Sequence, residues 1–277
     1  MHCRVGEGRN SMPKSRDNKA PIKVPERFMR GKGDVEIRLP GKKPEKGERL
    51  DESGHAYAGS QRQLQNYVNL RPLEFAEKVL ASLSLPPFPS STIRWVSPLA
   101  SDGYKEYRDE DFLCALDLHH LCGALRDFWP QGGPCWDALG IVDTPSGRGP
   151  LLVEAKSHVS ELQSECKAEA VSSMKRIRAA LEETKKWLRI PNPDHFDWLK
   201  PYYQTANRYA HLCFLRSRGI QAWLANVYFL KDPHFKDSPQ KREQWSVAIE
   251  NVERSLGVTG KGIPYSAKLI LEASCCY

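Results

Sequence analysis

The sequence lacks the features that mark several large classes of protein. No apolar run is long enough to span a bilayer, and the first residues contain no apolar signal-peptide core. None of the eight cysteines belongs to a C-x-x-C pair, which argues against a zinc ribbon and weakens an iron–sulfur interpretation. A glycine-rich phosphate loop is also absent, which disfavours an NTPase. We therefore expect a cytoplasmic protein with no membrane segment, in which most cysteines are reduced and buried.

The net charge of +7 is confined to the start of the chain. Residues 1–50 hold 14 Lys/Arg against 7 Asp/Glu, whereas the remaining residues hold 27 of each. Gly, Pro, Lys and Arg are abundant in residues 1–60, so we expect a disordered basic segment there, with one short strand over 35–39, and an α/β domain over 61–277. The basic segment would attract nucleic acid without specificity, although a solvated segment with no partner is the interpretation that its composition favours.

Two apolar segments in the middle of the chain carry acidic residues. Asp137 lies in the first segment, Pro134–Val142, and Glu154 and Lys156 lie in the second, Leu151–Lys156. The loop-forming residues between the two segments predict a β-hairpin. Carboxylates are costly inside apolar strands unless something compensates their charge.

The hairpin would gather these side chains only in one register. Side chains alternate along a strand, so Leu152, Glu154 and Lys156 share one face. Asp137 joins them if it pairs with Glu154 or Lys156, and a slip of one residue would place it on the opposite face.

A hard divalent metal is the usual compensation for such carboxylates. Asp137 and Glu154 would supply part of a Mg²⁺ shell and leave positions open for water and phosphate oxygens. Lys156 would position the attacking water and offset charge in the transition state. The alternative is a surface hairpin with a salt bridge between Glu154 and a nearby lysine, because Glu-x-Lys alone is a weak pattern.

This arrangement resembles the PD-(D/E)XK nuclease superfamily, over roughly residues 95–231. The resemblance implies a restriction-endonuclease-like core, metal binding by Asp137 and Glu154, a further ligand in the Ala155 carbonyl, and a hydrolytic role for Lys156. The chain is also similar to an uncharacterised prokaryotic group of this superfamily through Trp95–Pro98, Glu106–Asp109, Phe128–Pro130 and Tyr203–Leu212.

The chain departs from the family pattern in two ways, both in the segment that precedes Asp137. The nearest proline is Pro134, and Trp136 directly precedes the acid. The family core usually has a strand between its first helix and the Asp-bearing strand, whereas only 129–134 separates them here. Either that strand is lost or an earlier segment, Ile93–Val96, replaces it.

Other polar residues are candidates for the surroundings of the site. His158 would share the catalytic face if its strand continued, and would then assist proton transfer or form a structural hydrogen bond. Gln204 and Arg208 belong to a helical stripe, with Asn207 and His211, that would hold a phosphate or the Glu154 carboxylate. Members of the family often supply a further metal-binding acid from their first helix, and Glu106 or Glu110 would match it. Favourable interaction of both acids with the helix dipole is the simpler explanation.

Periodicity predicts a mixed central β-sheet flanked by helices, that is, an α/β fold. The expected strands are 63–69, 93–96, the hairpin, 219–231 as a parallel neighbour of the second hairpin strand, and 266–273. The expected helices are 72–83, 109–128, 161–188, 201–216 and 242–256.

The leading hypothesis is a Mg²⁺-dependent nuclease, with Mn²⁺ as an alternative ion. The resemblance alone favours DNA over RNA as the nucleic-acid partner. A catalytically inactive nucleic-acid-binding or assembly module on the same fold is the second hypothesis. A different metal-dependent hydrolase that uses the same carboxylates is the third. No feature of the sequence indicates an oligomeric state.

Overall fold

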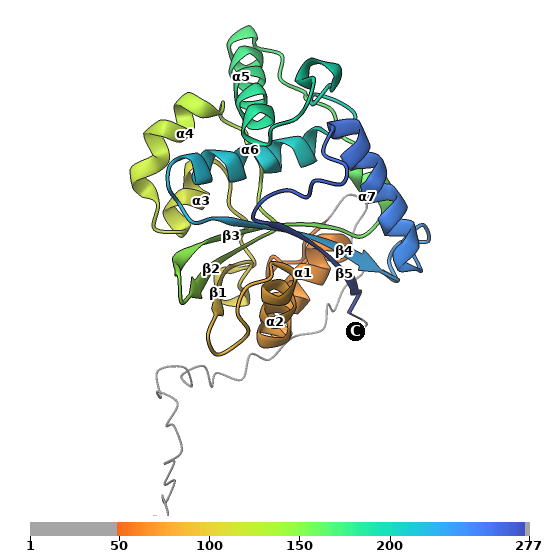
Figure 1. Cartoon of the computed structure of the whole chain (residues 1–277). Coiled ribbons are helices and arrows are strands. Elements are labelled where there is room, and N and C mark those ends of the chain that lie inside the picture. Colours follow the sequence, from red (N-terminus) through yellow and green to blue (C-terminus); the bar gives the residue numbers. More distant parts are fainter. Residues whose placement is uncertain (1–48, 275–277) are drawn as a thin grey trace, which may run out of the picture. The chain divides into compact units, whose positions relative to one another are not determined.

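A five-stranded mixed β-sheet forms the centre of residues 49–274, the part of the chain that the computed structural model describes (Figure 1). The spatial order follows the sequence: β1 (Thr92–Ser97), β2 (Ala138–Thr144), β3 (Gly147–Lys156), β4 (Trp223–Leu230) and β5 (Ser266–Glu272). The central strand of the first three, β2, is antiparallel to both β1 and β3, and β3, β4 and β5 run parallel. The predicted mixed α/β architecture is confirmed.

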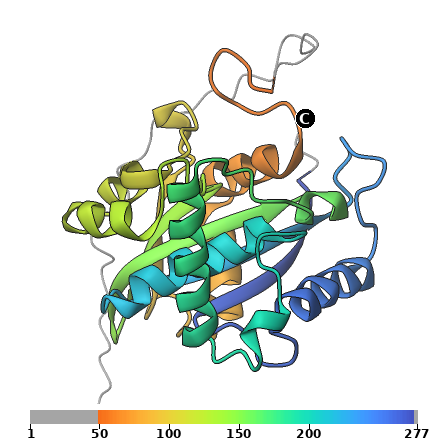
Figure 2. The ribbon, with the colours of Figure 1, turned by 90° about the horizontal axis from the view of Figure 1, so that it is seen from above.

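Helices cover both faces of this sheet (Figure 1). On one face, α1 (Gly59–Leu70) and α2 (Pro72–Ser82) pack against Leu151 and Val153 of β3 and against the same side of β4. The opposite face is covered by α3 (Asp109–Ala115), α4 (Cys122–Phe128), α5 (Val171–Trp187), α6 (Tyr203–Ser217) and α7 (Arg242–Leu256). Figure 2 shows α5 and α6 lying across that face. With both faces covered, all of β4 and most of β3 are buried, as is usual for parallel strands.

The hairpin forms as predicted, with a shorter turn than expected. The strands β2 and β3 pair up to Thr144 and Gly147, which leaves only two residues between them. Ala138 pairs with Val153, so continuing the register places Asp137 opposite Glu154. This is one of the two registers that bring Asp137 to the face of Glu154 and Lys156.

The strand β4 is the predicted parallel neighbour of β3. Glu154 pairs with Asn226 and Lys156 pairs with Tyr228. The connection between the strands contains α5 and α6, so the crossover carries α6 over the face on which Glu154 and Lys156 lie. On the other side, β1 pairs with β2, so the earlier segment does occupy the place beside the Asp-bearing strand.

Three predicted elements are wrong in type or extent. Residues 63–69 belong to helix α1 and not to a strand, because Leu64, Tyr67 and Val68 recur with helical spacing and are buried together. The predicted helix 109–128 is broken, since Asp117 adopts a left-handed backbone (φ 62°) and a 3₁₀ turn separates α3 from α4.

The third error concerns residues 161–188, where the helix begins only at Val171. The preceding segment bonds to the chain in front of α6: Ser164 N–H donates to the Pro201 carbonyl at 2.6 Å, and Cys166 N–H donates to that of Leu199 at 2.8 Å. These long-range bonds replace the helical bonds that the local sequence favours.

Residues 1–48 of the expected disordered segment, with its short strand, lie outside the described residues, whereas 49–60 are ordered, with a β-bridge between Leu50 and Ala56. Of that segment, Gly59 and Ser60 already form the first turn of α1, so the helix begins before the predicted boundary. Among residues 49–274, no helix is long and apolar enough to cross a membrane.

Gly149 allows β3 to lie close to the backbone of Gln221, in the segment that leads into β4. A Cβ atom at this position would lie 1.8 Å from the Gln221 carbonyl oxygen, which is backbone and cannot rotate away. We expect Gly149→Ala to lower the free energy of unfolding by about 1–3 kcal/mol, measured by urea denaturation. Gly123→Ala in α4 is the control, because its Cβ would meet nothing closer than 3.9 Å. Equal stability of the two variants would contradict this account of the β3–β4 packing.

Candidate active site

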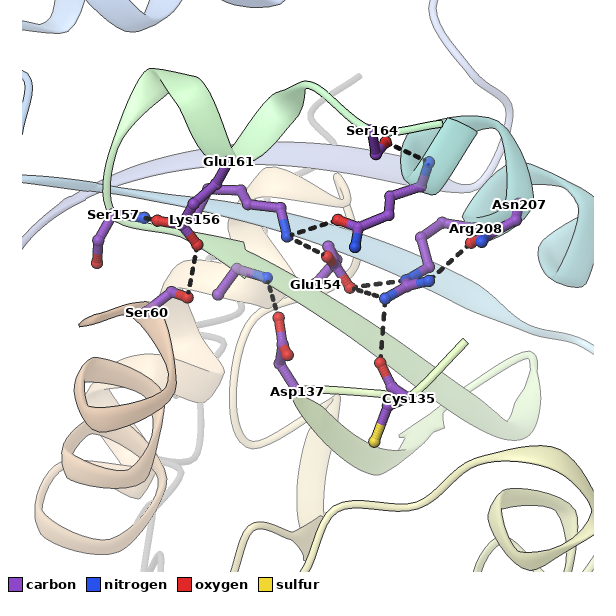
Figure 3. A network of polar contacts seen from close by, with 12 residues as sticks. Ser60, Cys135, Asp137, Glu154, Lys156, Ser157, Glu161, Ser164, Asn207 and Arg208 are labelled. Carbon is purple, nitrogen blue, oxygen red and sulfur yellow. Dashed lines mark hydrogen bonds and ion pairs between the residues drawn. The ribbon is translucent and has the colours of Figure 1, made fainter. Parts of the chain in front are cut away.

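The candidate site lies where β2 begins and β3 ends, beneath the first turns of α6 (Figure 3). Asp137 directly precedes β2, and its Oδ2 accepts a hydrogen bond from the Ala155 N–H at 2.7 Å. This bond fixes the Asp137 carboxylate against the C-terminal end of β3. Ala155, whose carbonyl is the expected further ligand, is therefore tied to Asp137 through its N–H.

Glu154 is the most heavily paired residue of the site. It is 7% exposed, and each of its carboxylate oxygens binds a different cation. Lys156 Nζ contacts Oε1 at 2.5 Å, and Arg208 Nε contacts Oε2 at 2.6 Å. A buried carboxylate is stable only when paired and hydrogen-bonded in this way.

Arg208 of α6 is held by several groups at once. It is 5% exposed and donates to the Asn207 side-chain oxygen at 2.7 Å and to the Cys135 carbonyl at 3.1 Å. Its guanidinium also lies 5.2 Å from the centre of the Trp136 ring, which adds a cation–π contact. Arg208 thus joins α6 to the segment that enters β2.

Gln204 lies one helical turn before Arg208 and contacts the lysine. Its Oε1 accepts from Lys156 Nζ at 3.2 Å, and its backbone N–H donates to Ser164 Oγ at 2.8 Å. The polar stripe expected on this helix therefore faces Glu154 and Lys156, as Figure 3 shows. The fourth member, His211, is different: it is buried among aromatic rings, and burial lowers its pKa to about 3.

The charges of the site shift one another's pKa values. Burial, reinforced by repulsion from Glu154, raises the pKa of Asp137 well above its usual range. Burial would also raise the pKa of Glu154, but the charges of Arg208 and Lys156 outweigh it and hold that pKa below its usual value. Burial opposes the charge of Lys156, yet Glu154 and Asp137 raise its pKa overall. The charge of Lys156 therefore compensates Asp137 only in part, whereas Glu154 is paired with two cations.

A third carboxylate, Glu106, lies near the other two, since its charge contributes to the raised pKa of Asp137. Its Oε1 is buried, its Oε2 lies 3.6 Å from Cys135 Sγ, and the Gln61 side chain forms a hydrogen bond with the carboxyl group. Burial is the main cause of its raised pKa, with repulsion from Glu154 as a further contribution. The simpler explanation from the helix dipole does not fit Glu106, which lies outside α3. Glu110 is a surface residue paired with Arg126 at 2.6 Å.

His158 does not join this network. The strand ends at Lys156, and the His158 ring contacts Ser160 Oγ at 2.7 Å and packs on Phe235 with ring centres 4.7 Å apart. Its backbone N–H donates to Glu161, and the residue caps a 3₁₀ turn, Val159–Leu162. The condition on which His158 would share the catalytic face is not met, because the strand ends at Lys156, and the alternative, a structural hydrogen bond, is what forms.

Among residues 49–274, no three His, Cys, Asp or Glu side chains are already gathered as a metal-binding group. The three acids nevertheless suit a cation, because all three carry buried carboxylate oxygens and their charges repel one another. Carboxylate oxygens are the ligands that Mg²⁺ prefers. The site can therefore hold a hard cation only if the acids close around it.

Comparison with known proteins identifies no relative: no protein-family model matches the chain, and neither curated proteins nor solved structures contain a match. The fold and the site together define the protein as a mixed α/β domain with a buried carboxylate–lysine–arginine network.

The raised pKa of Asp137 predicts a substitution that stabilises the fold. In the unfolded chain the pKa of Asp137 is the ordinary 3.8. Folding therefore becomes less favourable as the pH rises from 3.8 through the raised pKa of the folded state. Asp137→Asn removes this penalty, and we expect a higher Tm at neutral pH, by about 2–4 °C if the gain is about 1 kcal/mol. The gain should vanish below about pH 3, where both states hold the proton. Thermal unfolding across pH checks this, and a lower Tm for the variant at neutral pH would contradict it.

Proposed function

We propose that the protein is a metal-dependent nuclease with a restriction-endonuclease-like core, and that it hydrolyses phosphodiester bonds of DNA. The observation that carries the proposal is the pairing of two carboxylates, Asp137 and Glu154, in one register position beside Lys156. Carboxylates that repel each other across two neighbouring strands are suited to sharing a divalent cation. DNA is preferred to RNA through the resemblance to the PD-(D/E)XK superfamily.

Each residue has a distinct part in this proposal. Asp137, Glu154 and the Ala155 carbonyl would hold Mg²⁺ or Mn²⁺, with Glu106 as a further oxygen ligand. The ion, when bound, polarises the phosphate and acidifies a water molecule. Lys156 would orient that water and offset the negative charge that develops on the phosphate. Gln204 would keep the lysine in place through the contact at 3.2 Å.

Cleavage assays with purified full-length protein test the proposal. The substrates are supercoiled plasmid, linear duplex and single-stranded DNA, each with Mg²⁺, Mn²⁺ or EDTA. Cleavage that needs the metal and is lost in Asp137→Asn is the expected result. Turnover of a small phosphodiester but of no polymer would instead favour another metal-dependent hydrolase, and failure to bind either metal in calorimetry would overturn the roles of Asp137 and Glu154.

One observation favours a second candidate, a catalytically inactive module that binds nucleic acid or assembles with a partner. Both oxygens of Glu154 are already bound to cations, Lys156 and Arg208, so the carboxylate is neutralised without any metal. Metal-independent DNA binding with no turnover of any substrate would favour this candidate.

A further inference from the structure

A cleft of about 790 Å³ opens directly beside the candidate site. Segments 129–135 and 163–170 form its two sides, and the first turns of α6 form its floor. Gln204 and Arg208 line its inner end, and the same two side chains contact Lys156 and Glu154. A ligand in the cleft would therefore adjoin the reacting groups.

The sides of the cleft are irregular in structure but are held by hydrogen bonds. The Asp109 carboxylate accepts from the backbone N–H groups of Gly132 at 3.1 Å and Gly133 at 2.8 Å, which anchors the first segment to α3. Bonds from Ser164 and Cys166 to the chain before α6 anchor the second segment. The cleft is thus formed in advance of any ligand.

The lining combines the groups that bind an unpaired nucleotide. Tyr203 is half-buried and stacks on Trp129 with ring centres 6.4 Å apart and planes 26° apart, which provides an aromatic surface for a base. Amide side chains, which carry both donors and acceptors, suit base edges, and they come from Gln131, Gln163, Gln204 and Asn207. Arg108 and Lys167 add cations for the backbone, and Glu165 and Glu169 also line the cleft, so its charged lining is of mixed sign.

The shape and charge of the domain favour a single strand over a duplex. The cleft is concave and falls within the usual range for small ligands, about 300–1,000 Å³, whereas a duplex is read by elements that project into its grooves. Outside the first 50 residues the chain has equal numbers of acidic and basic residues, so binding would rely on stacking and amide contacts, which are open to unpaired bases and closed to the paired bases of a duplex.

We propose that this cleft binds unpaired nucleotides next to the scissile phosphate, and that the substrate is single-stranded nucleic acid. The proposal rests on the nuclease function proposed above, because it assigns the substrate of the same site. Tyr203 stacks on a base, and Lys167 contacts a phosphate.

Binding of fluorescently labelled oligonucleotides to the full-length protein in EDTA tests this assignment apart from catalysis. We expect a single-stranded DNA 12-mer to bind at least tenfold more tightly than its duplex at physiological salt. Tyr203→Ala should weaken single-strand binding about tenfold, whereas Tyr203→Phe keeps the ring and the affinity. Lys167→Ala should make the plot of log binding constant against log salt concentration less steep by about 0.7, because one phosphate contact is lost. Lys175→Ala, exposed on α5 outside the cleft, is the matched control.

The outcomes separate this proposal from the nuclease function. Equal or tighter duplex binding, no binding of either probe, or unchanged affinity in both Tyr203→Ala and Lys167→Ala would overturn the cleft assignment. Single-strand binding as expected but no cleavage with Mg²⁺ or Mn²⁺ would overturn the nuclease and leave the cleft assignment standing. Comparing single-stranded RNA with single-stranded DNA of the same sequence identifies the preferred sugar. Tighter binding of either single strand than of the duplex supports the proposal.

Discussion

Lys156→Ala is expected to slow metal-dependent cleavage by about 10²–10³-fold, the usual effect of removing one group that stabilises transition-state charge. Lys156 Nζ is largely buried, lies 2.5 Å from Glu154, and is positioned by Gln204. In a site that excludes water, a fixed positive charge interacts strongly with the developing charge of a phosphate. The loss should fall on kcat and not on KM, because the lysine would act in the transition state.

The measurement is single-turnover cleavage of labelled DNA, with circular dichroism to establish folding. Lys156→Gln is the informative companion, because it retains polar contacts with Glu154 and Gln204 but removes the charge. Lys175→Ala, on the exposed side of α5, is the control for general loss of positive charge. A wild-type rate in both Lys156 variants would remove this residue from the chemistry.

Local pattern was sufficient to predict most of the sheet. The alternation in 151–156 predicts the strand and its faces, because Leu152 and Leu151 do lie in the cores on opposite sides of the sheet. The stripe on α6 was predictable for the same reason, since residues at i and i+4 share one face of a helix. Periods of two and of 3.6 residues are properties of the backbone, and they hold wherever the chain folds.

The sequence left two partners open for the stripe that contains Arg208, a phosphate or the Glu154 carboxylate. The choice of Glu154 required the structure, since 54 residues separate it from Arg208. Glu106 illustrates the same limit. An antiparallel bridge between Tyr107 and Trp136 brings Glu106 beside Cys135 and buries one of its oxygens. Neither contact follows from spacing along the chain, because both depend on how distant segments pack. The break of the helix at Asp117 is a third case: the left-handed residue permits a change of direction that the apolar stripe does not indicate.

Arg208→Ala is expected to lower the free energy of unfolding by about 3–5 kcal/mol, because it leaves a buried carboxylate with one of its two cations. Urea denaturation at neutral pH measures the loss. The control is Arg254→Ala, whose partner Glu250 lies at 2.8 Å in an exposed ion pair that should contribute at most about 1 kcal/mol. Equal losses in the two variants would mean that the Arg208–Glu154 pair is not buried in solution.

The dependence of this loss on pH follows from the lowered pKa of Glu154. An acid whose folded pKa is below its unfolded value stabilises the fold above the unfolded pKa, and the contribution disappears as pH falls through the folded value. Since Arg208 is a major cause of the lowered pKa, the difference between wild type and Arg208→Ala should shrink in acid. A difference that stays constant down to pH 2 would assign the loss to packing of the arginine on Trp136 and not to its charge.

The same variant distinguishes the two proposed functions. In a nuclease, Mg²⁺ competes with Arg208 for Glu154, so removing the arginine should let the ion bind more tightly and raise the Tm of the variant more than that of wild type. In an inactive module the arginine has permanently taken the place of the ion, and Mg²⁺ should leave the Tm of both proteins unchanged. Thermal unfolding with and without Mg²⁺ therefore tests whether Arg208 is a competitor of the metal at Glu154 or its replacement.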